Sequence, residues 1–379
     1  MVSASVKPTS DSLLLGIWQR DLESDGSGVI RVSLLSAAVA AVAAVGGVLH
    51  YTGTAPTVVF VLTGAALGGL AWIIGVATES VGGRFGPAVT GVLQSTLGNL
   101  PELFIVLFSL SAGQIVVAQT SILGSLFANA LLVLGLAIVA GARVAEEEVM
   151  TFRKRLPNDT ATLLLLALFA IGLLGLSDRI GDRASRHQVA ISVVGAVCLL
   201  AVYAAWLWSY LRSDRGSERA LEEPSHGALP FRAALVLLAA AGVAAAFVSD
   251  WFVGAIDPAV KAFGISKAFT GIVIVAIAGN AVENIVGITL AAKGKADLAV
   301  SVVKNSVAQI ACFLFPALVL LSLFFSDRLT FVLNPVYICA LAVTALAVWQ
   351  ITGDGEAYAY EGWALVAIYV ILATVTFYE

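Results

Sequence analysis

Two short stretches combine residue types that could bind and release a cation inside a membrane. Gly98-Asn99-Leu100-Pro101-Glu102 lies in the apolar run 87–110, and Gly279-Asn280-Ala281-Val282-Glu283 lies in the apolar run 269–292. A charged residue at the centre of a bilayer costs about 2.5–3.5 kcal/mol on insertion scales, and it usually has a functional role. Two such motifs with the same spacing predict a duplicated ion site.

Helical periodicity places the key groups of each motif on one side of a helix. Residues three and four apart share a face, so Gly98, Asn99 and Glu102 lie together. Gly98 has no side chain and lets another backbone approach. Pro101 lacks a backbone N–H and frees a carbonyl one turn earlier. The second motif has the same spacing but no proline, so the sequence offers less support for a helix break there.

More oxygen-bearing side chains follow each motif in the next predicted helix, and Asn305 is one of them. Ca²⁺ prefers about six to eight oxygen ligands in a flexible shell, and the spans contain no His or Cys cluster that would favour zinc or copper. Two carboxylates with several amides therefore favour Ca²⁺, with Na⁺ as the alternative. The candidate cation site comprises Gly98, Asn99, Glu102, Gln119, Ser125, Asn129, Gly279, Asn280, Glu283, Ser306 and Gln309.

The same two glutamates could also carry protons. Burial favours the protonated form of a carboxyl group, and a neighbouring cation favours its ionised form. A cation and protons would then compete for Glu102 and Glu283, which is the minimal chemistry of an antiporter. Glu79 and Asp250 lie at predicted helix ends, where they are either solvated interface residues or part of a vestibule that attracts cations.

The composition indicates a polytopic membrane protein. Of the 379 residues 59% are hydrophobic and 12% are charged, whereas soluble proteins carry about 25% charged residues. The net charge of −4 without a basic block argues against nucleic acid as a partner. The chain has no zinc-protease, serine-hydrolase or paired intramembrane aspartate pattern, so we expect no enzyme and no cofactor.

About eleven apolar runs are long enough to span a bilayer. We interpret them as one N-terminal helix and two five-helix repeats, whose odd helix number places them in opposite orientations. The expected divisions are 1–55 for the N-terminal segment and first helix, 56–211 for the first repeat, 212–229 for a cytoplasmic linker and 230–379 for the second repeat. The runs are 32–50, 56–78, 87–110, 115–141, 160–177, 188–211, 230–249, 268–292, 297–325, 329–350 and 362–378.

The distribution of basic residues predicts the orientation. With the N-terminus in the cytoplasm, fourteen of the 21 Lys and Arg residues lie in cytoplasmic segments and six on the opposite side. The C-terminus is then outside, because the helix number is odd. The compact loops and the lack of a long targeting region favour a prokaryotic plasma membrane.

The two motifs resemble the paired signatures of the Ca²⁺/H⁺ exchanger (CAX) family within the cation/Ca²⁺ exchanger superfamily. Residues 119–129, with their Ile-Leu-Gly-Ser core, and the segment from Lys293 to Asp297 are similar to the regions that follow each signature. The resemblance covers roughly residues 56–350. It implies signature helices that cross at the membrane centre, with Glu102 and Glu283 binding Ca²⁺ in exchange for H⁺.

Two positions depart from the family pattern. The family usually has His directly after the second glutamate, whereas this chain has Asn284, which cannot titrate. Lys304 precedes Asn305-Ser306-Val307, where the family favours Gly-Ser-Ser. Lys304 could repel a divalent cation, but we expect it to extend its ammonium group to the cytoplasmic surface.

The sequence therefore predicts an antiporter that exports cytoplasmic Ca²⁺ against protons by alternating access. The alternatives are a Na⁺/Ca²⁺ or monovalent cation/H⁺ antiporter and, less favoured, a cation channel. Na⁺ and Mn²⁺ are the other cations to consider. The expected surroundings are the lipid bilayer, and the oligomeric state is left open.

Overall fold

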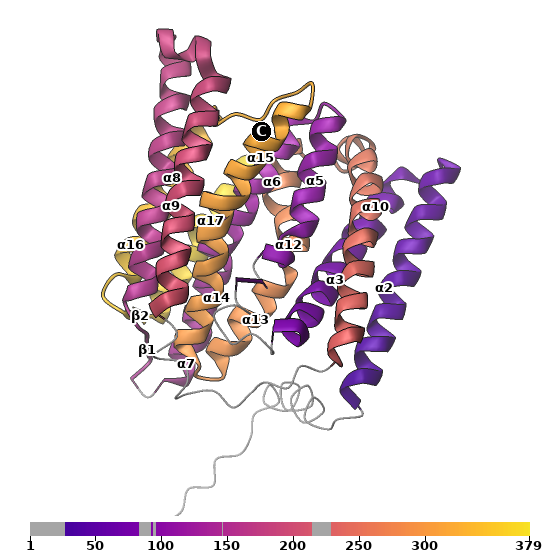
Figure 1. The fold of residues 1–379 in the computed structure, drawn as a ribbon, viewed down its shortest axis with the longest axis horizontal. Coiled ribbons are helices and arrows are strands. Elements are labelled where there is room, and N and C mark those ends of the chain that lie inside the picture. The colour runs from indigo at the N-terminus through magenta and orange to yellow at the C-terminus, as the bar shows by residue number, and fades with distance from the viewer. Residues whose placement is uncertain (1–26, 83–91, 94–95, 146, 214–228) are drawn as a thin grey trace, which may run out of the picture.

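Residues 27–82, 92–93, 96–145, 147–213 and 229–379 are described by a computed structural model. Within them the chain forms a bundle of long helices with one short two-stranded sheet (Figure 1). Nine helices of this described part could cross a membrane, or ten if the bent pair around Asn280 counts as one span. The predicted all-α polytopic class is confirmed. The number of eleven helices stays a prediction, because the run 87–110 begins outside the described residues. Most of the predicted linker at 212–229 also lies outside them.

The first half of the described chain consists of long helices joined by short turns. In order, the elements are α2 (Ser27–Thr52), α3 (Pro56–Gly82), α5 (Leu100–Ser111), α6 (Ile115–Phe127), the π-helical η1 (Ala128–Val133), α7 (Leu134–Val144), β1 (Val149–Thr151), α8 (Arg155–Ile180), the 3₁₀ turn η2 (Arg183–His187) and α9 (Gln188–Ser213).

The second half has the same general plan, with two further π-helical segments. Its elements are α10 (Phe231–Phe263), α11 (Lys267–Phe269), η5 (Thr270–Val275), α12 (Ala276–Gly279), α13 (Ala281–Ala292), α14 (Ala296–Gln309), η6 (Ile310–Leu314), α15 (Phe315–Leu321), η7 (Ser322–Phe324), α16 (Pro335–Thr352), β2 (Glu356–Tyr358) and α17 (Ala359–Phe377).

Local sequence signals mark several helix ends. Ser266 caps α11 by accepting a 2.8 Å hydrogen bond from the Phe269 N–H, and Asn334 caps α16 by accepting one of 3.0 Å from the Val336 N–H. Such side-chain oxygens satisfy amide groups that have no partner within the helix. Gly264 ends α10 with a φ of +64°, a conformation in which glycine avoids the steric cost of a Cβ.

The two halves place corresponding turns at opposite ends of the molecule. The turn between α5 and α6 lies at the upper end in Figure 1, and the turn between α13 and α14 lies at the lower end. Corresponding signature helices therefore run in opposite directions, as expected for an inverted repeat.

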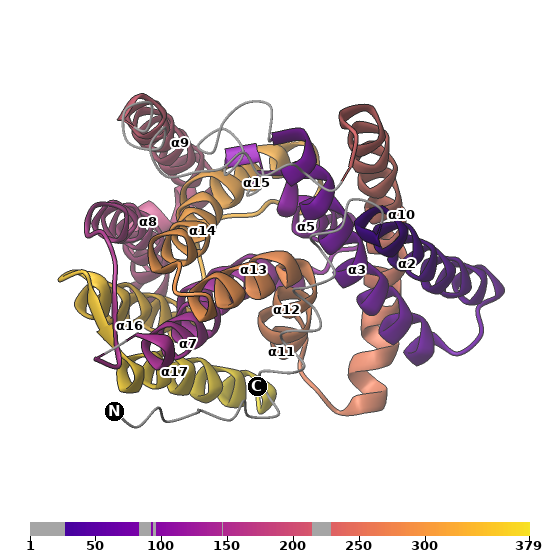
Figure 2. The same ribbon diagram turned by 90° about the horizontal axis from the view of Figure 1, so that it is seen from below.

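Two groups of helices have separate apolar packing. A large cluster, with Phe127 and Phe315 at 0% and 1% exposure, joins most of the helices from α5 to α9 and from α13 to α17. A second cluster, with Phe60 stacked on Phe252 at 4.8 Å, joins α3 and α10 to parts of α5, α6 and η5. Seen from below, α2, α3 and α10 stand together on one side of the bundle (Figure 2). The first signature helix therefore contributes to both groups.

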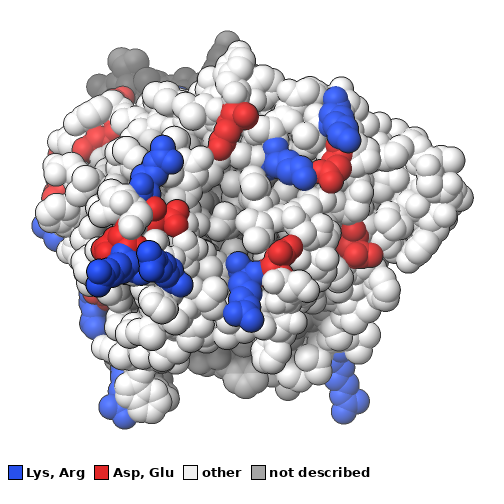
Figure 3. Space-filling model, turned by 90° about the horizontal axis from the view of Figure 1, so that it is seen from above, with Lys and Arg blue, Asp and Glu red and all other residues white. Residues whose placement is uncertain are grey.

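The lower end of the molecule in Figure 1 has contacts between segments that we did not predict from the sequence. Strands β1 and β2 pair antiparallel, with Val149 opposite Tyr358. Next to them, the Arg153 N–H donates to Asp297 Oδ1 at 2.7 Å, which links the β1–α8 connection to the first turn of α14. The upper face has acidic and basic side chains scattered over a mostly uncharged surface (Figure 3). There Lys267 and Asp257 form a 2.7 Å ion pair.

Candidate cation-binding site

Both signature helices are interrupted at the asparagine of the motif. Asn99 precedes α5 with φ −83° and ψ 8°, and Asn280 separates α12 from α13 with φ −94° and ψ 22°. The helical parts on either side of Asn280 meet at 62°. The second motif contains no proline, so Pro101 cannot be the cause that both interruptions share. The second interruption is thus present without the proline that would have indicated it in the sequence.

The interruptions place each glutamate at the start of a helix. Glu102 lies in the first turn of α5 and Glu283 in the first turn of α13. The N-terminal end of a helix favours negative charge, because its first N–H groups have no partner within the helix. The breaks therefore create two anion-stabilising positions within otherwise apolar spans.

Each glutamate packs against the glycine of the other motif. A Cβ atom built on Gly98 would lie 2.6 Å from Glu283 Oε1, and one built on Gly279 would collide with the Glu102 carboxylate. Contacts this close need a residue without a side chain. The two motifs, far apart in sequence, therefore meet in a reciprocal arrangement that brings both carboxylates to one place.

The carboxylates are buried, and the Ser125 hydroxyl lies near the carboxylate of Glu102. Glu102 is 0% exposed and Glu283 is 4% exposed. All four carboxylate oxygens and Asn129 Oδ1 have no hydrogen-bond partner in this described part of the chain. An ionised carboxylate buried in this way is strongly unfavourable. The arrangement needs either a bound cation or protons.

A network of amides and hydroxyls joins the two halves beside the carboxylates. Asn280 Nδ2 donates to Ser125 Oγ at 2.8 Å and to the Ala276 carbonyl at 2.9 Å. Asn129 Nδ2 donates to Asn280 Oδ1 at 2.7 Å and to Ser306 Oγ at 3.1 Å. Ser125, Asn129, Asn280 and Ser306 are all 0% exposed. This network connects α6 and η1 of the first half to the second signature and α14.

The repeat offset relates Ser125 and Ser306. Ser306 follows Ser125 by the same 181 residues that separate Gly279 from Gly98. Gln309, on the next turn, donates from Nε2 to Thr96 Oγ1 at 2.6 Å. Thr96, three residues before Asn99, was absent from the predicted site. Its spacing from the motif asparagine is the signal that could have identified it.

Three predicted residues lie apart from this cluster. Gln119 donates from Nε2 to the Val332 carbonyl at 3.0 Å, so its amide nitrogen is bonded to another segment, and its role as a ligand stays a prediction. Glu79 and Asp250 are exposed on α3 and α10. Their vestibule role stays a prediction.

Lys304 does not extend to the surface as we expected. Its side chain is 0% exposed, and its Nζ donates to Thr352 Oγ1 on α16 at 3.0 Å. The expectation failed because it depended on how deeply α14 is packed against α13 and α8, which the sequence does not reveal. Asn284, the other departure from the family pattern, is partly buried on α13.

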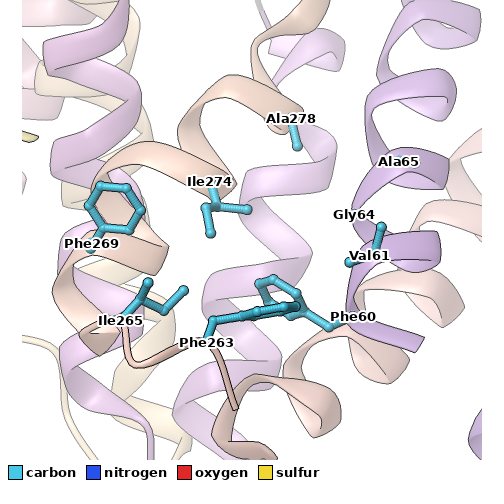
Figure 4. A pocket seen from close by; sticks show the side chains of 9 residues that line it. All are labelled: Phe60, Val61, Gly64, Ala65, Phe263, Ile265, Phe269, Ile274 and Ala278. Atoms are coloured by element: carbon cyan, nitrogen blue, oxygen red, sulfur yellow. The ribbon is translucent and has the colours of Figure 1, made fainter. Parts of the chain in front are cut away.

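An apolar groove ends next to the second motif. It has a volume of about 400 Å³ and lies between α3, the end of α10 and the segment from α11 to α12 (Figure 4). Ala278, directly before Gly279, lies at one edge, and Phe60 and Phe263 lie at another. Among the described residues no group of three or more His, Cys, Asp or Glu side chains could hold a metal ion. Oxygen ligands around the two glutamates thus remain the candidate chemistry.

Comparisons with known proteins show which family the chain resembles over most of its length. The model of the family described as "Sodium/calcium exchanger protein" matches residues 55–211 and 233–378. A Ca²⁺/H⁺ antiporter of Synechocystis sp. is 31% identical over 351 residues, covering 87% of this chain and 93% of the relative. The Ca²⁺/H⁺ antiporter ChaA of Bacillus subtilis is 31% identical over 347 residues, covering 90% and 97%. The solved structure of YfkE matches with a TM-score of 0.77 and 29% identity, covering 92% of this chain and all of the other.

Proposed function

The chain belongs to the sodium/calcium exchanger protein family, and we propose that it exchanges cytoplasmic Ca²⁺ for protons at a site formed by Glu102 and Glu283. The observation that carries the proposal is the reciprocal packing of each glutamate on the glycine of the other motif. It assembles two buried carboxylates, neither of which is paired with a basic side chain among the described residues. Exchange of Ca²⁺ for protons is also the activity named for relatives that match nearly their whole length.

The chemistry of the exchange is competition for the carboxylates. Ca²⁺ favours their ionised form, and its departure leaves buried anions that must take up protons. Asn129 Oδ1 faces no donor in the described part of the chain and would add a neutral oxygen ligand. Asn280 and Ser125 would hold the second motif in place through their mutual hydrogen bond. Asn99 and Gln309 are the further candidate ligands.

Alternating access would require one group of helices to move against the other. The separate packing of α3 and α10 supports these helices as the moving unit. The apolar groove between them and α12 offers space for a small displacement next to Gly279. In the proposed orientation the lower end in Figure 1 is cytoplasmic and the C-terminus is outside, in a prokaryotic plasma membrane. The predicted repeat boundaries at 56–211 and 230–379 belong to the same proposal.

Everted membrane vesicles with an imposed proton gradient test the proposal. Addition of Ca²⁺ should dissipate the gradient, and Glu102→Gln or Glu283→Gln should abolish this effect at normal protein levels. Glu356→Gln is a matched control, because Glu356 is exposed on β2 far along the chain from both motifs. Loss of transport in the control as well would show that the assay reports damage rather than the site.

The same vesicles distinguish the alternative antiporters. Asn284 in place of the usual His leaves the choice of ion the least supported part of the proposal. Parallel additions of Ca²⁺, Mn²⁺, Na⁺ and K⁺ identify the transported cation. Dissipation by Na⁺ or K⁺ but not by Ca²⁺ would refute the Ca²⁺ assignment and favour a monovalent cation/H⁺ antiporter.

A further inference from the structure

Lys304 is a buried basic residue within a predicted span, and the exchange chemistry above does not use it. Its side chain is 0% exposed within the span Ala296–Phe324. No carboxylate lies within ion-pair distance of its ammonium group among the described residues. An unpaired buried charge costs several kcal/mol, and ionisable residues within spans usually have a specific task.

The ammonium group binds the C-terminal end of α16. Thr352 is the last residue of that helix and is itself 0% exposed. Its hydroxyl donates to the Val348 carbonyl at 2.6 Å, so its oxygen acts as the acceptor for Lys304 Nζ. The last carbonyls of a helix lack partners within it and carry partial negative charge, which favours a cation there.

This bond attaches α14 to the lower end of the molecule, near the 3.4 Å hydrogen bond that the Thr160 hydroxyl donates to the Lys304 carbonyl. A further attachment is between Arg153 and Asp297, in the first turn of α14. Three residues after Thr352 comes Gly355, whose carbonyl accepts a 2.8 Å hydrogen bond from the Phe152 N–H, and β2 begins at the next residue. Both attachments of α14 therefore lead to the segments around the β1–β2 sheet.

Lys304 and Ser306 point to opposite sides of α14. Two residues are separated by about 200° around a helix with 3.6 residues per turn. Lys304 therefore binds Thr352 from the side of α14 that faces away from the cation site. Ser306, on the side that faces the site, accepts a hydrogen bond from Asn129. A rotation of α14 would displace Ser306 and Gln309 relative to the carboxylates.

The corresponding position of the first repeat shows that the fold does not need a charge here. Leu123 precedes Ser125 by two residues, as Lys304 precedes Ser306, and it is also 0% exposed. An apolar side chain of similar size is thus compatible with the packing of the equivalent helix.

We propose that Lys304 is a positioning residue of the cation site, which sets the rotation of α14 through its bond to Thr352 and thereby directs Ser306 and Gln309 toward the bound cation. The inference rests on the proposed function, since it assigns Lys304 a role in the same site. Lys304 itself touches neither the cation nor the protons in this account.

The test measures Ca²⁺-dependent dissipation of the proton gradient in vesicles, normalised to the amount of folded protein. Lys304→Met and Thr352→Val each remove one side of the bond and keep a similar volume. We expect each to raise the half-saturating Ca²⁺ concentration about tenfold with little change in maximal rate. The double variant should equal the single variants, because both remove the same bond. Thr352→Ser keeps the acceptor, and Leu123→Met is the matched control on the first repeat; both should behave like the unmodified protein.

Several outcomes would overturn the inference. If Lys304→Met lowers only the amount of folded protein and leaves half-saturation unchanged, the residue is merely structural. If it lowers the half-saturating concentration, the ammonium acts by repelling the cation. Additive effects of the two variants would show that they act through different contacts. If the unmodified protein transports another cation, the Ca²⁺ assignment fails separately, and the same variants are compared with that cation.

Discussion

The two halves of the cation site are alike in their carboxylates and unlike in the groups that surround them. Glu102 and Glu283 both begin a helix after a break at asparagine, and each packs on the glycine of the other motif. Asn280 of the second motif is held from the first half by Ser125 and Asn129. On the second half, a buried Lys304 stands where the first half has Leu123. The comparison suggests that the symmetric features carry the exchange and that the asymmetric ones adjust it.

The largest expected effect tests the symmetric part. Glu102→Gln and Glu283→Gln should each reduce Ca²⁺-driven proton release to the level of vesicles without the protein, because each carboxylate is needed for charge balance. The double variant should be no worse than either single variant. A single variant that retains substantial coupled exchange would show that the two glutamates are not equivalent.

The second largest effect is expected at the two motif glycines, where the distances to an added Cβ allow the two halves to be compared. Gly279→Ala places a Cβ into the Glu102 carboxylate, and Gly98→Ala places one 2.6 Å from Glu283 Oε1. Overpacking of this kind costs about 1–3 kcal/mol. We expect transport to fall about tenfold or more, with Gly279→Ala the more severe. Gly172→Ala is the control, since its Cβ would meet Ile338 at an ordinary 3.7 Å; equal losses in all three would contradict the assigned contacts.

A smaller effect should distinguish the amides. Asn280→Ala leaves Asn129 and Ser125 without one of their partners, at a cost of about 1–3 kcal/mol for buried polar groups. It should raise the half-saturating Ca²⁺ concentration in the vesicle assay. Asn305→Ala is the comparison, because Asn305 Oδ1 has no partner among the described residues. If Asn305→Ala weakens transport as much as Asn280→Ala, the network is not what positions the second motif.

The smallest effect is expected outside the site. Glu79→Gln and Asp250→Asn remove exposed carboxylates, whose influence on a cation is screened within about 8 Å at physiological ionic strength. Ca²⁺ uptake rates should change less than about twofold there and somewhat more at low ionic strength. A complete loss of transport in either variant would move that residue into the transport pathway itself.

The sequence predicted the spans and both glutamates because burial and charge in an apolar run are local properties. It offered less support for the interruption at Asn280, since the expected cause was proline and the second motif has none. It also misplaced Lys304, whose partner Thr352 comes from a helix remote in sequence. The hydrogen bond from Gln119 to the Val332 carbonyl is a tertiary contact that the sequence does not reveal. The contacts of each glutamate with the opposite glycine are likewise tertiary, so single-sequence spacing reveals the pair but not how the two motifs interlock.

The most direct test of the central claim is the pH dependence of Ca²⁺ affinity in the unmodified protein. If Ca²⁺ and protons compete for Glu102 and Glu283, acidification on the Ca²⁺-loading side should raise the half-saturating Ca²⁺ concentration. The maximal rate should still be attained when Ca²⁺ is saturating. Alkalinisation should lower that concentration until it reaches a plateau, where the carboxylates are ionised before Ca²⁺ binds. A half-saturating concentration that does not change with pH would contradict a shared site for the two ions.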